Sequence, residues 1–245
     1  MPNAAKAWEI DAYPKLLAEI RSALGPTKII SAAVPGLRRD MLAFTKDTIP
    51  SITSSLDFFN IMTYDLMNRR DNITKHHTGV ELSLDAVNAY LENGVPPEKA
   101  NLGFAFYPKW YRTRLDGGCE ESSIGCKTML MEDPITGGDL GQAGAFAWSD
   151  DVPFELQQSF EKALASGTYD SVHGGYYYWD SEEKIWWTWD TTDAISKKFP
   201  LIVQPKALGG VFAWGLGEDS KDWTHLKALS AGYRKHASAH LKEEL

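Results

Sequence analysis

Tyr64 and Asp65 end an apolar run in residues 58–72, FFNIMTYDLMNRRDN, and polar residues follow them. A phenol donates a hydrogen bond and a carboxylate accepts several, so the pair suits a ligand with amide and hydroxyl groups. If the apolar segments of the chain are parallel strands, their carboxyl ends meet at one edge, where ligands bind. The other segments end in Pro35 and Gly36, in Tyr107 with Lys109, and in Trp214 with Glu218 and Asp219. Phenols, a carboxylate and an indole that meet at one edge indicate a carbohydrate subsite, with Trp214 as its apolar floor.

Four short apolar segments predict the strands that position these residues. They are residues 28–36 (KIISAAVPG), 56–65 (LDFFNIMTYD), 100–108 (ANLGFAFYP) and 208–219 (LGGVFAWGLGED). Nearly continuous apolar runs of this length are typical of strands buried on both faces of a parallel sheet. Helical patterns separate them at residues 12–24, 40–47, 82–94 and 191–201, and a last helix begins near Asp222. We expect Ser83 to be the N-cap of the helix at 82–94 and Gly94 to follow its end. The alternation predicts an α/β fold.

A long interval, residues 111–189, interrupts this alternation between the third strand and its helix. It contains a helical pattern at residues 154–165 and the aromatic segment 174–190, GGYYYWDSEEKIWWTWD. The aromatic segment predicts a β-hairpin around a polar turn. Because compact proteins rarely carry so long a loop without structure of its own, we interpret the interval as an inserted α+β subdomain.

Composition excludes several classes of function. The formal net charge of −8 argues against a nucleic-acid partner. No apolar run approaches the roughly 20 residues of a membrane span, and the first residues do not resemble a signal peptide, so the sequence leaves the localisation open. Nucleotide-binding and nucleophile motifs are absent, and we expect no cofactor. Nine Trp exceed what a core needs, and surplus Trp is typical of sugar-binding grooves.

The cysteine pair and the histidine pair bear on two further features, a disulfide and a metal site. Cys119 and Cys126 lie in the polar loop CEESSIGC, either as a small disulfide loop or as two unpaired thiols. His76 and His77 are adjacent, so their side chains project in different directions, and we expect a solvated loop pair rather than a metal site. We therefore predict no metal.

Three motifs resemble glycoside hydrolase family 18, which contains chitinases and chitinase-like lectins, and the likeness is greatest to fungal members. FFNIMTYDLMNRRDN is similar to the M-x-Y-D motif of the sixth barrel strand, and FAFYPKWY to the F-Y-G-R segment of the seventh. GGVFAWGLGED is similar to the eighth strand, and KIISAAVPG then falls on the fifth. The resemblance implies a partial (β/α)8 TIM barrel, strands five to eight, with the family's inserted α+β subdomain. It implies three regions. Residues 1–110 hold barrel strands five to seven with their helices, residues 111–189 are the inserted subdomain, and residues 190–245 hold the final barrel helix, the eighth strand and the C-terminal helix.

The resemblance also implies roles for individual residues. Tyr64 and Asp65 would hold the distorted sugar and its acetamido group, Met62 would shape the pocket, and Trp214 would stack under the ring. Tyr107 would line the rim, whereas Lys109 replaces the usual Arg. The family's D-x-x-D-x-D-x-E motif, whose final Glu is the general acid of a substrate-assisted reaction, is absent from these residues.

Three hypotheses follow for function. In the first, the chain is a family 18 fragment that binds chitin or chito-oligosaccharide and does not hydrolyse it alone. In the second, it is a chitinase when completed by an amino-terminal half, and in the third a structural half-barrel. Since half a barrel leaves open strand edges, we expect a homodimer.

Overall fold

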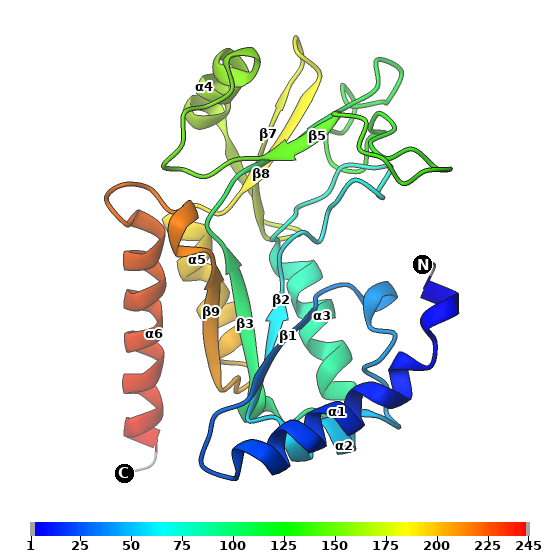
Figure 1. The fold of residues 1–245 in the computed structure, drawn as a ribbon. Helices are drawn as coiled ribbons and strands as arrows, with labels where there is room; N and C mark the ends of the chain where they lie inside the picture. Colours follow the sequence, from blue (N-terminus) through cyan, green and yellow to red (C-terminus); the bar gives the residue numbers. More distant parts are fainter. Residues whose placement is uncertain (1–2, 244–245) are drawn as a thin grey trace.

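The computed structural model describes the backbone of residues 3–243 and the side chains of residues 5–237. One sheet consists of four parallel strands, in the order β1 (Ser31–Pro35), β2 (Phe58–Met62), β3 (Ala100–Ala105) and β9 (Gly210–Trp214) (Figure 1). Val34 lies opposite Ile61, and Ile61 opposite Leu102. Because the strands share one direction, their carboxyl ends lie at the same edge. The chain therefore has a mixed α/β fold, and the strand ends named above are neighbours.

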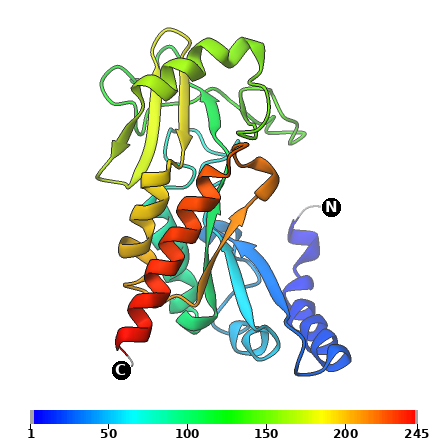
Figure 2. The same cartoon turned by 90° about the vertical axis from the view of Figure 1, so that its left-hand side faces the viewer.

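Helices pack against one face of this parallel sheet, as Figures 1 and 2 show. Phe59 and Ile61 are fully buried on that face, where Phe59 contacts the ring of Tyr90. The alternate residues of β2, among them Asn60 and Met62, are only half-buried, so the expectation of burial on both faces is wrong for β2. The helices are α1 (Glu9–Leu24), α2 (Ile49–Ser55), α3 (Val80–Glu92), α5 (Thr192–Lys198) and α6 (Thr224–Glu243), with a π-helical turn at Phe199–Val203 after α5.

The prediction of a helix at residues 40–47 is wrong. The helix expected at residues 40–47 is replaced by a 3-10 turn, Arg38–Asp40, and by α2 further along the chain. Thr48 donates its hydroxyl to the carbonyl of Ala43 at 2.7 Å and accepts the N–H of Thr45 at 2.9 Å, and such bonds compete with a helix. Two further 3-10 turns flank the remaining elements, at Asn3–Lys6 and Pro97–Lys99.

The start of α3 also differs from the prediction, while its end agrees with it. Ser83 is not the N-cap but lies buried inside the helix, which begins at Val80 after Gly79. The backbone N–H groups of Val80 and Glu81 donate to carbonyls of a distant turn, those of Gly174 and His173, at 3.0 Å each. Tertiary contacts therefore satisfy the helix start without a side-chain cap. Gly94 follows the helix with φ +100°, a conformation that favours glycine.

A second sheet of five antiparallel strands is built from residues 109–189. Its order is β5 (Ala143–Ala145), β4 (Lys109–Arg112), β8 (Ile185–Trp189), β7 (Gly175–Asp180) and β6 (Thr168–Asp170), and it contacts α4 (Gln157–Ser166) after a 3-10 turn at Phe154–Leu156. The predicted hairpin is confirmed, since β7 and β8 pair with Tyr178 opposite Trp187. Asp180 accepts the backbone N–H groups of Glu182 and Glu183 and so closes the turn.

Most tryptophans form the core of this second sheet rather than a groove, which corrects the interpretation from composition. Trp186 and Trp187 are fully buried, and Trp189 is 2% exposed. Trp187 contacts Phe160 of α4 at a ring distance of 4.9 Å. The Trp surplus therefore stabilises a small sheet, because large flat side chains fill the space under it with few residues.

Candidate functional site

Tyr64 and Asp65 leave β2 through a sharp turn next to β3. Thr63 fixes this turn, because its hydroxyl donates to the carbonyl of Gly103 at 2.6 Å and accepts the N–H of Gly103 at 3.0 Å. A Cβ at Gly103 would lie 2.9 Å from the ring of Tyr64, so glycine there makes room for the phenol. Asp65 has φ +53°, in the left-handed region that costs non-glycine residues energy. Such a conformation is common at functional sites.

The Asp65 carboxylate receives two hydrogen bonds from the next strand segment. Tyr107 donates its hydroxyl to Oδ1 at 2.9 Å, and Lys109 donates its ammonium to the same oxygen at 2.8 Å. The Asp65 side chain is 52% exposed, whereas that of Lys109 is 13% exposed. Among the described residues, these side-chain bonds to Asp65 both go to Oδ1. The second oxygen, Oδ2, is thus positioned to accept a bond from a ligand.

Tyr64 and Tyr107 form an apolar cluster behind this carboxylate. Their rings meet edge to face at 6.4 Å, and Tyr64 also contacts Phe212 at 6.1 Å. Burial raises the pKa of Tyr64 to about 12, and the Asp65 charge adds to this shift. Burial likewise raises the pKa of Tyr107, again with Asp65 contributing. Of the two phenols, Tyr107 donates a hydrogen bond to Asp65.

Met62 and Trp214 occupy different positions around this cluster. Met62 is half-buried and packs against it. Trp214 ends β9 opposite Ala105 and is 59% exposed, so one ring surface is open to solvent. Burial raises the pKa of Glu218, which lies in the 3-10 turn Leu216–Glu218 after β9. The structure thus brings Tyr64, Asp65, Tyr107 and Lys109 into contact, with Met62 beside them and Trp214 on the neighbouring strand.

A depression of about 680 Å³ opens at the same edge. Sequence reasoning named Pro35, Gly36, Met62, Tyr64 and Asp65 in its lining. It did not identify the wall on the opposite side, where Arg69 donates to Glu132 at 2.8 Å. Arg69 belongs to the basic pair that follows the strand motif, so the sequence does show one half of this wall. Its partner Glu132 is 63 residues away, which no local pattern reveals. Phe212 was also missed, although it alternates with Trp214 along β9.

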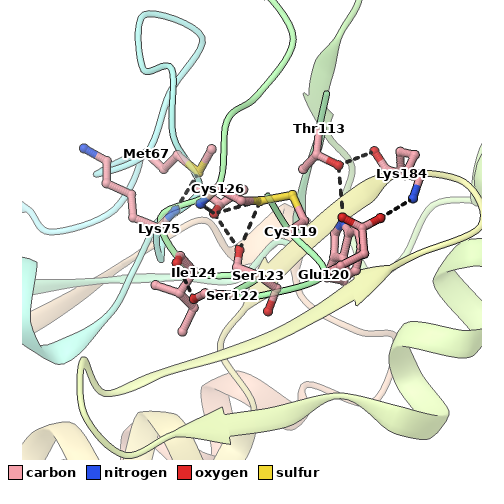
Figure 3. The surroundings of a disulfide bond; sticks show 12 residues. Met67, Lys75, Thr113, Cys119, Glu120, Ser122, Ser123, Ile124, Cys126 and Lys184 are labelled. Atoms are coloured by element: carbon pink, nitrogen blue, oxygen red, sulfur yellow. Dashed lines mark hydrogen bonds and ion pairs between the residues drawn. A yellow bond between two sulfur atoms is a disulfide. The ribbon is translucent and has the colours of Figure 1, made fainter. Parts of the chain in front are cut away.

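The two cysteines are joined by a disulfide, which Figure 3 places beside the segment that follows Asp65. Both sulfur-bearing residues are buried, at 3% for Cys119 and 4% for Cys126. Thr74 donates its hydroxyl to the carbonyl of Ser123 at 2.6 Å and accepts the N–H of Cys126 at 3.1 Å. The bonded loop therefore braces residues 72–75, and through them the chain that leaves the site.

His76 and His77 are buried, so the expectation of a solvated pair is wrong. Their exposed fractions are 2% and 0%. The connection from β2 to α3 lies between the two sheets: His77 contacts the ring of Tyr107 at 5.3 Å, and the indole N–H of Trp186 donates to Lys75. Burial lowers the pKa of His77 well below its usual value, so the imidazole is neutral.

Among the described helices, none is long and apolar enough to cross a membrane.

Comparisons with known proteins identify a family and several relatives of this chain. Glycosyl hydrolases family 18 matches the chain over residues 2–219. Nod factor hydrolase protein 1 of Medicago truncatula is 28% identical over 84% of this chain, and Endochitinase 1 of Metarhizium robertsii is 28% identical over 67%. The chain spans only 51% and 36% of these two relatives.

Solved structures show the same fold. A chitinase from Rhizomucor miehei aligns with a TM-score of 0.70 at 21% identity, over 90% of this chain and 65% of that one. A class V chitinase mutant from Cycas revoluta in complex with (GlcNAc)3 aligns at 0.68 and 21% identity, over 92% and 64%. Because the family model matches residues 2–219, most of this chain, the chain belongs to glycosyl hydrolase family 18.

Proposed function

We propose that this chain binds chitin or chito-oligosaccharides at the edge formed by Tyr64, Asp65, Tyr107 and Trp214, and that alone it does not hydrolyse them. The observation that carries the proposal is the Asp65 carboxylate, held at Oδ1 by Tyr107 and Lys109 while half of its side chain is open to solvent. An acetamido group offers an N–H to such an acceptor. The carboxylate would bond that N–H, as the family resemblance implies.

Trp214 supplies the apolar part of the proposed site. A pyranose ring presents C–H groups on its faces, and an exposed indole can cover them while hydroxyls bond to polar neighbours. Trp214 ends β9 and is 59% exposed, so its ring is accessible to a sugar. The solved Cycas revoluta relative contains (GlcNAc)3, which makes the trisaccharide a suitable probe.

Hydrolysis needs a proton donor for the leaving oxygen, and the site as described supplies a poor one. Oδ1 of Asp65 already accepts hydrogen bonds from the Tyr107 hydroxyl and the Lys109 ammonium. The motif D-x-x-D-x-D-x-E, which carries the family's general acid, does not occur in these 245 residues. General acid–base catalysis alone is typically worth about 10²–10⁴-fold in rate. We therefore propose binding without turnover.

Calorimetric titration with (GlcNAc)3 tests the proposal. We expect binding by the natural sequence and a loss of at least about tenfold in affinity, about 1.4 kcal/mol, for Trp214→Ala and for Asp65→Asn. Trp8→Ala is the matched control, because Trp8 is 66% exposed and lies at the start of α1 rather than at the carboxyl end of a parallel strand. Unchanged affinity in both site variants would contradict the proposal. Absence of any binding would favour the structural half-barrel.

A second candidate is a chitinase completed by an additional polypeptide segment. It is favoured by the length of the relatives, of which this chain spans about half or less. In this interpretation the four parallel strands are the last four of a (β/α)8 barrel, residues 111–189 are the inserted subdomain, and residues 1–110 and 190–245 form the barrel part. Co-expression with a segment that carries D-x-x-D-x-D-x-E should then produce turnover of a fluorogenic chito-oligosaccharide. Asp65→Ala should abolish it.

A further inference from the structure

Three side chains from distant parts of the sequence meet behind the candidate site. His76 comes from the connection between β2 and α3, Asp170 ends β6, and His173 lies in the turn between β6 and β7. Nε2 of His76 is 3.0 Å from Oδ2 of Asp170, and Nδ1 of His173 is 2.6 Å from the same oxygen. Each residue offers one ligand atom, and these atoms lie within 4.8 Å of one another. We call these residues the His–Asp–His cluster.

The surrounding structure orients each of these groups. Asp170 accepts the backbone N–H of Val172 through Oδ1 at 2.8 Å, which leaves Oδ2 directed at the two imidazoles. The ring of His76 lies against Gly175, where a Cβ would come within 2.4 Å of Nδ1, so only glycine leaves space for it. Nε2 of His76 faces Asp170, whereas its buried Nδ1 has no hydrogen-bond partner among the described residues. The cluster is therefore built by packing and not by chance exposure.

A further carboxylate, that of Glu81, lies near the other nitrogen of His173 and outside the cluster. Oε2 of Glu81, in the first turn of α3, is 4.0 Å from Nε2 of His173. The backbone bonds from Val80 and Glu81 to the β6–β7 turn hold this helix start against the cluster. A cavity of about 250 Å³ next to the cluster is lined by His76, Glu81 and His173, and gives room for a water ligand of an ion. His76 is 2% exposed, whereas His173 and Glu81 are 39% and 62% exposed in their side chains.

Two imidazoles and a carboxylate are the ligand types that Zn²⁺ takes in proteins, at about 2.0–2.2 Å. Tetrahedral binding at that length sets neighbouring ligand atoms about 3.3 Å apart, so small rotations of His173 and Asp170 suffice to admit the ion. The adjacent residues His76 and His77 do not form a metal site together, because the ring of His77 contacts Tyr107 instead. The partners of His76 are more than 90 residues away in sequence.

We propose that His76, Asp170 and His173 bind Zn²⁺, with water as the fourth ligand. This role is independent of the carbohydrate site and goes beyond it. The ion would join the β2–α3 connection and the start of α3 to the antiparallel sheet. It would thus fix the two sheets of the molecule relative to each other.

Calorimetric titration of the tag-free, EDTA-treated chain with ZnCl₂ tests the proposal, with MgCl₂ as the comparison. We expect one equivalent of Zn²⁺ per chain and no comparable binding of Mg²⁺. His173→Gln and Asp170→Asn should each weaken Zn²⁺ binding by at least about tenfold. His240→Gln, which removes a histidine from a different part of the chain, should leave affinity and stoichiometry unchanged.

X-ray absorption at the zinc edge checks the ligands directly and does not depend on whether a variant folds. It should show scattering from two imidazoles with the remaining ligands oxygen. Zn²⁺ affinity that is unchanged in His173→Gln, stoichiometry that is lost in His240→Gln, or a spectrum without imidazole scattering would overturn the proposal. Because His173 is partly exposed, its variant keeps the buried part of the fold intact.

Discussion

Lys198 and Asp190 form a buried ion pair where the antiparallel sheet returns to the parallel one. Their side chains are 1% and 0% exposed. Lys198 Nζ also donates to the hydroxyl of Thr78 at 2.8 Å, and Nε2 of His225 lies 3.2 Å from the Asp190 carbonyl oxygen. The pair thus links α5, the end of β8, the β2–α3 connection and α6. We predict that it is the most sensitive single electrostatic contact of the described fold.

Lys198→Met keeps most of the buried volume and removes the cation. Asp190 is then a buried carboxylate without its counter-charge, and breaking such a pair costs roughly 3–5 kcal/mol in the free energy of unfolding. Burial already raises the pKa of Asp190 and lowers that of Lys198, each opposed by the charge of the partner. Without Lys198 the pKa of Asp190 rises further. The destabilisation should therefore be greatest at neutral pH and shrink as falling pH protonates the carboxyl.

Urea unfolding followed by tryptophan fluorescence at pH 7 and pH 5 measures this loss. Lys197→Met is the matched control, since the neighbouring Lys197–Asp193 pair is 39% and 64% exposed and should contribute only about 0–1 kcal/mol. Lys198→Met/Asp190→Asn should recover about 2 kcal/mol or more of the loss, because the uncompensated charge is gone. If Lys198→Met costs less than about 1 kcal/mol at pH 7, or if the two changes simply add, the reasoning is refuted.

Three further predictions concern the site, the disulfide and assembly. Burial raises the pKa of Tyr64 to about 12, above the ordinary tyrosine value of about 10, so the folded chain keeps a proton that the unfolded chain releases. Between pH 9 and 11 the unfolding free energy should therefore fall about 1.4 kcal/mol more than in Tyr64→Phe, as measured by urea unfolding. Cys119→Ser/Cys126→Ser opens a disulfide loop with a sequence separation of 7 and should lower the free energy of unfolding by about 2 kcal/mol. Dithiothreitol should lower the stability of the natural sequence and leave that of the double variant unchanged. β1 and β9 are the outer strands of the parallel sheet, so light scattering should give a dimer of 27.3 kDa chains, and a stable monomer would contradict this.

Strand and motif predictions agree well with the structure, because they depend on local patterns. Apolar runs closed by turn residues identified all four parallel strands, and the M-x-Y-D segment identified the strand end at Tyr64 and Asp65. The hairpin at residues 174–190 followed from aromatic strands around a polar turn. The helix at residues 40–47 failed because Thr45 and Thr48 bond locally, which propensity and periodicity do not register.

Predictions failed where a distant segment decides the environment of a residue. His76 and His77 were expected in solvent, yet the second sheet covers them. Ser83 was expected to be an N-cap, yet a turn 90 residues later supplies carbonyls to the helix start. The wall of the depression formed by Arg69 and Glu132 was missed for the same reason.

The sequence by itself determined the family, the parallel strands and the residues at their carboxyl ends. These depend on hydrophobic pattern and short motifs, whose physical cause lies within a few residues of chain. Only the tertiary structure decided that Lys109 and Tyr107 share one oxygen of Asp65, that the tryptophans are core, and that His76 meets Asp170 and His173. Hydrogen bonds and burial act over a few ångströms in space, and the chain brings together residues that are 40 to more than 90 positions apart.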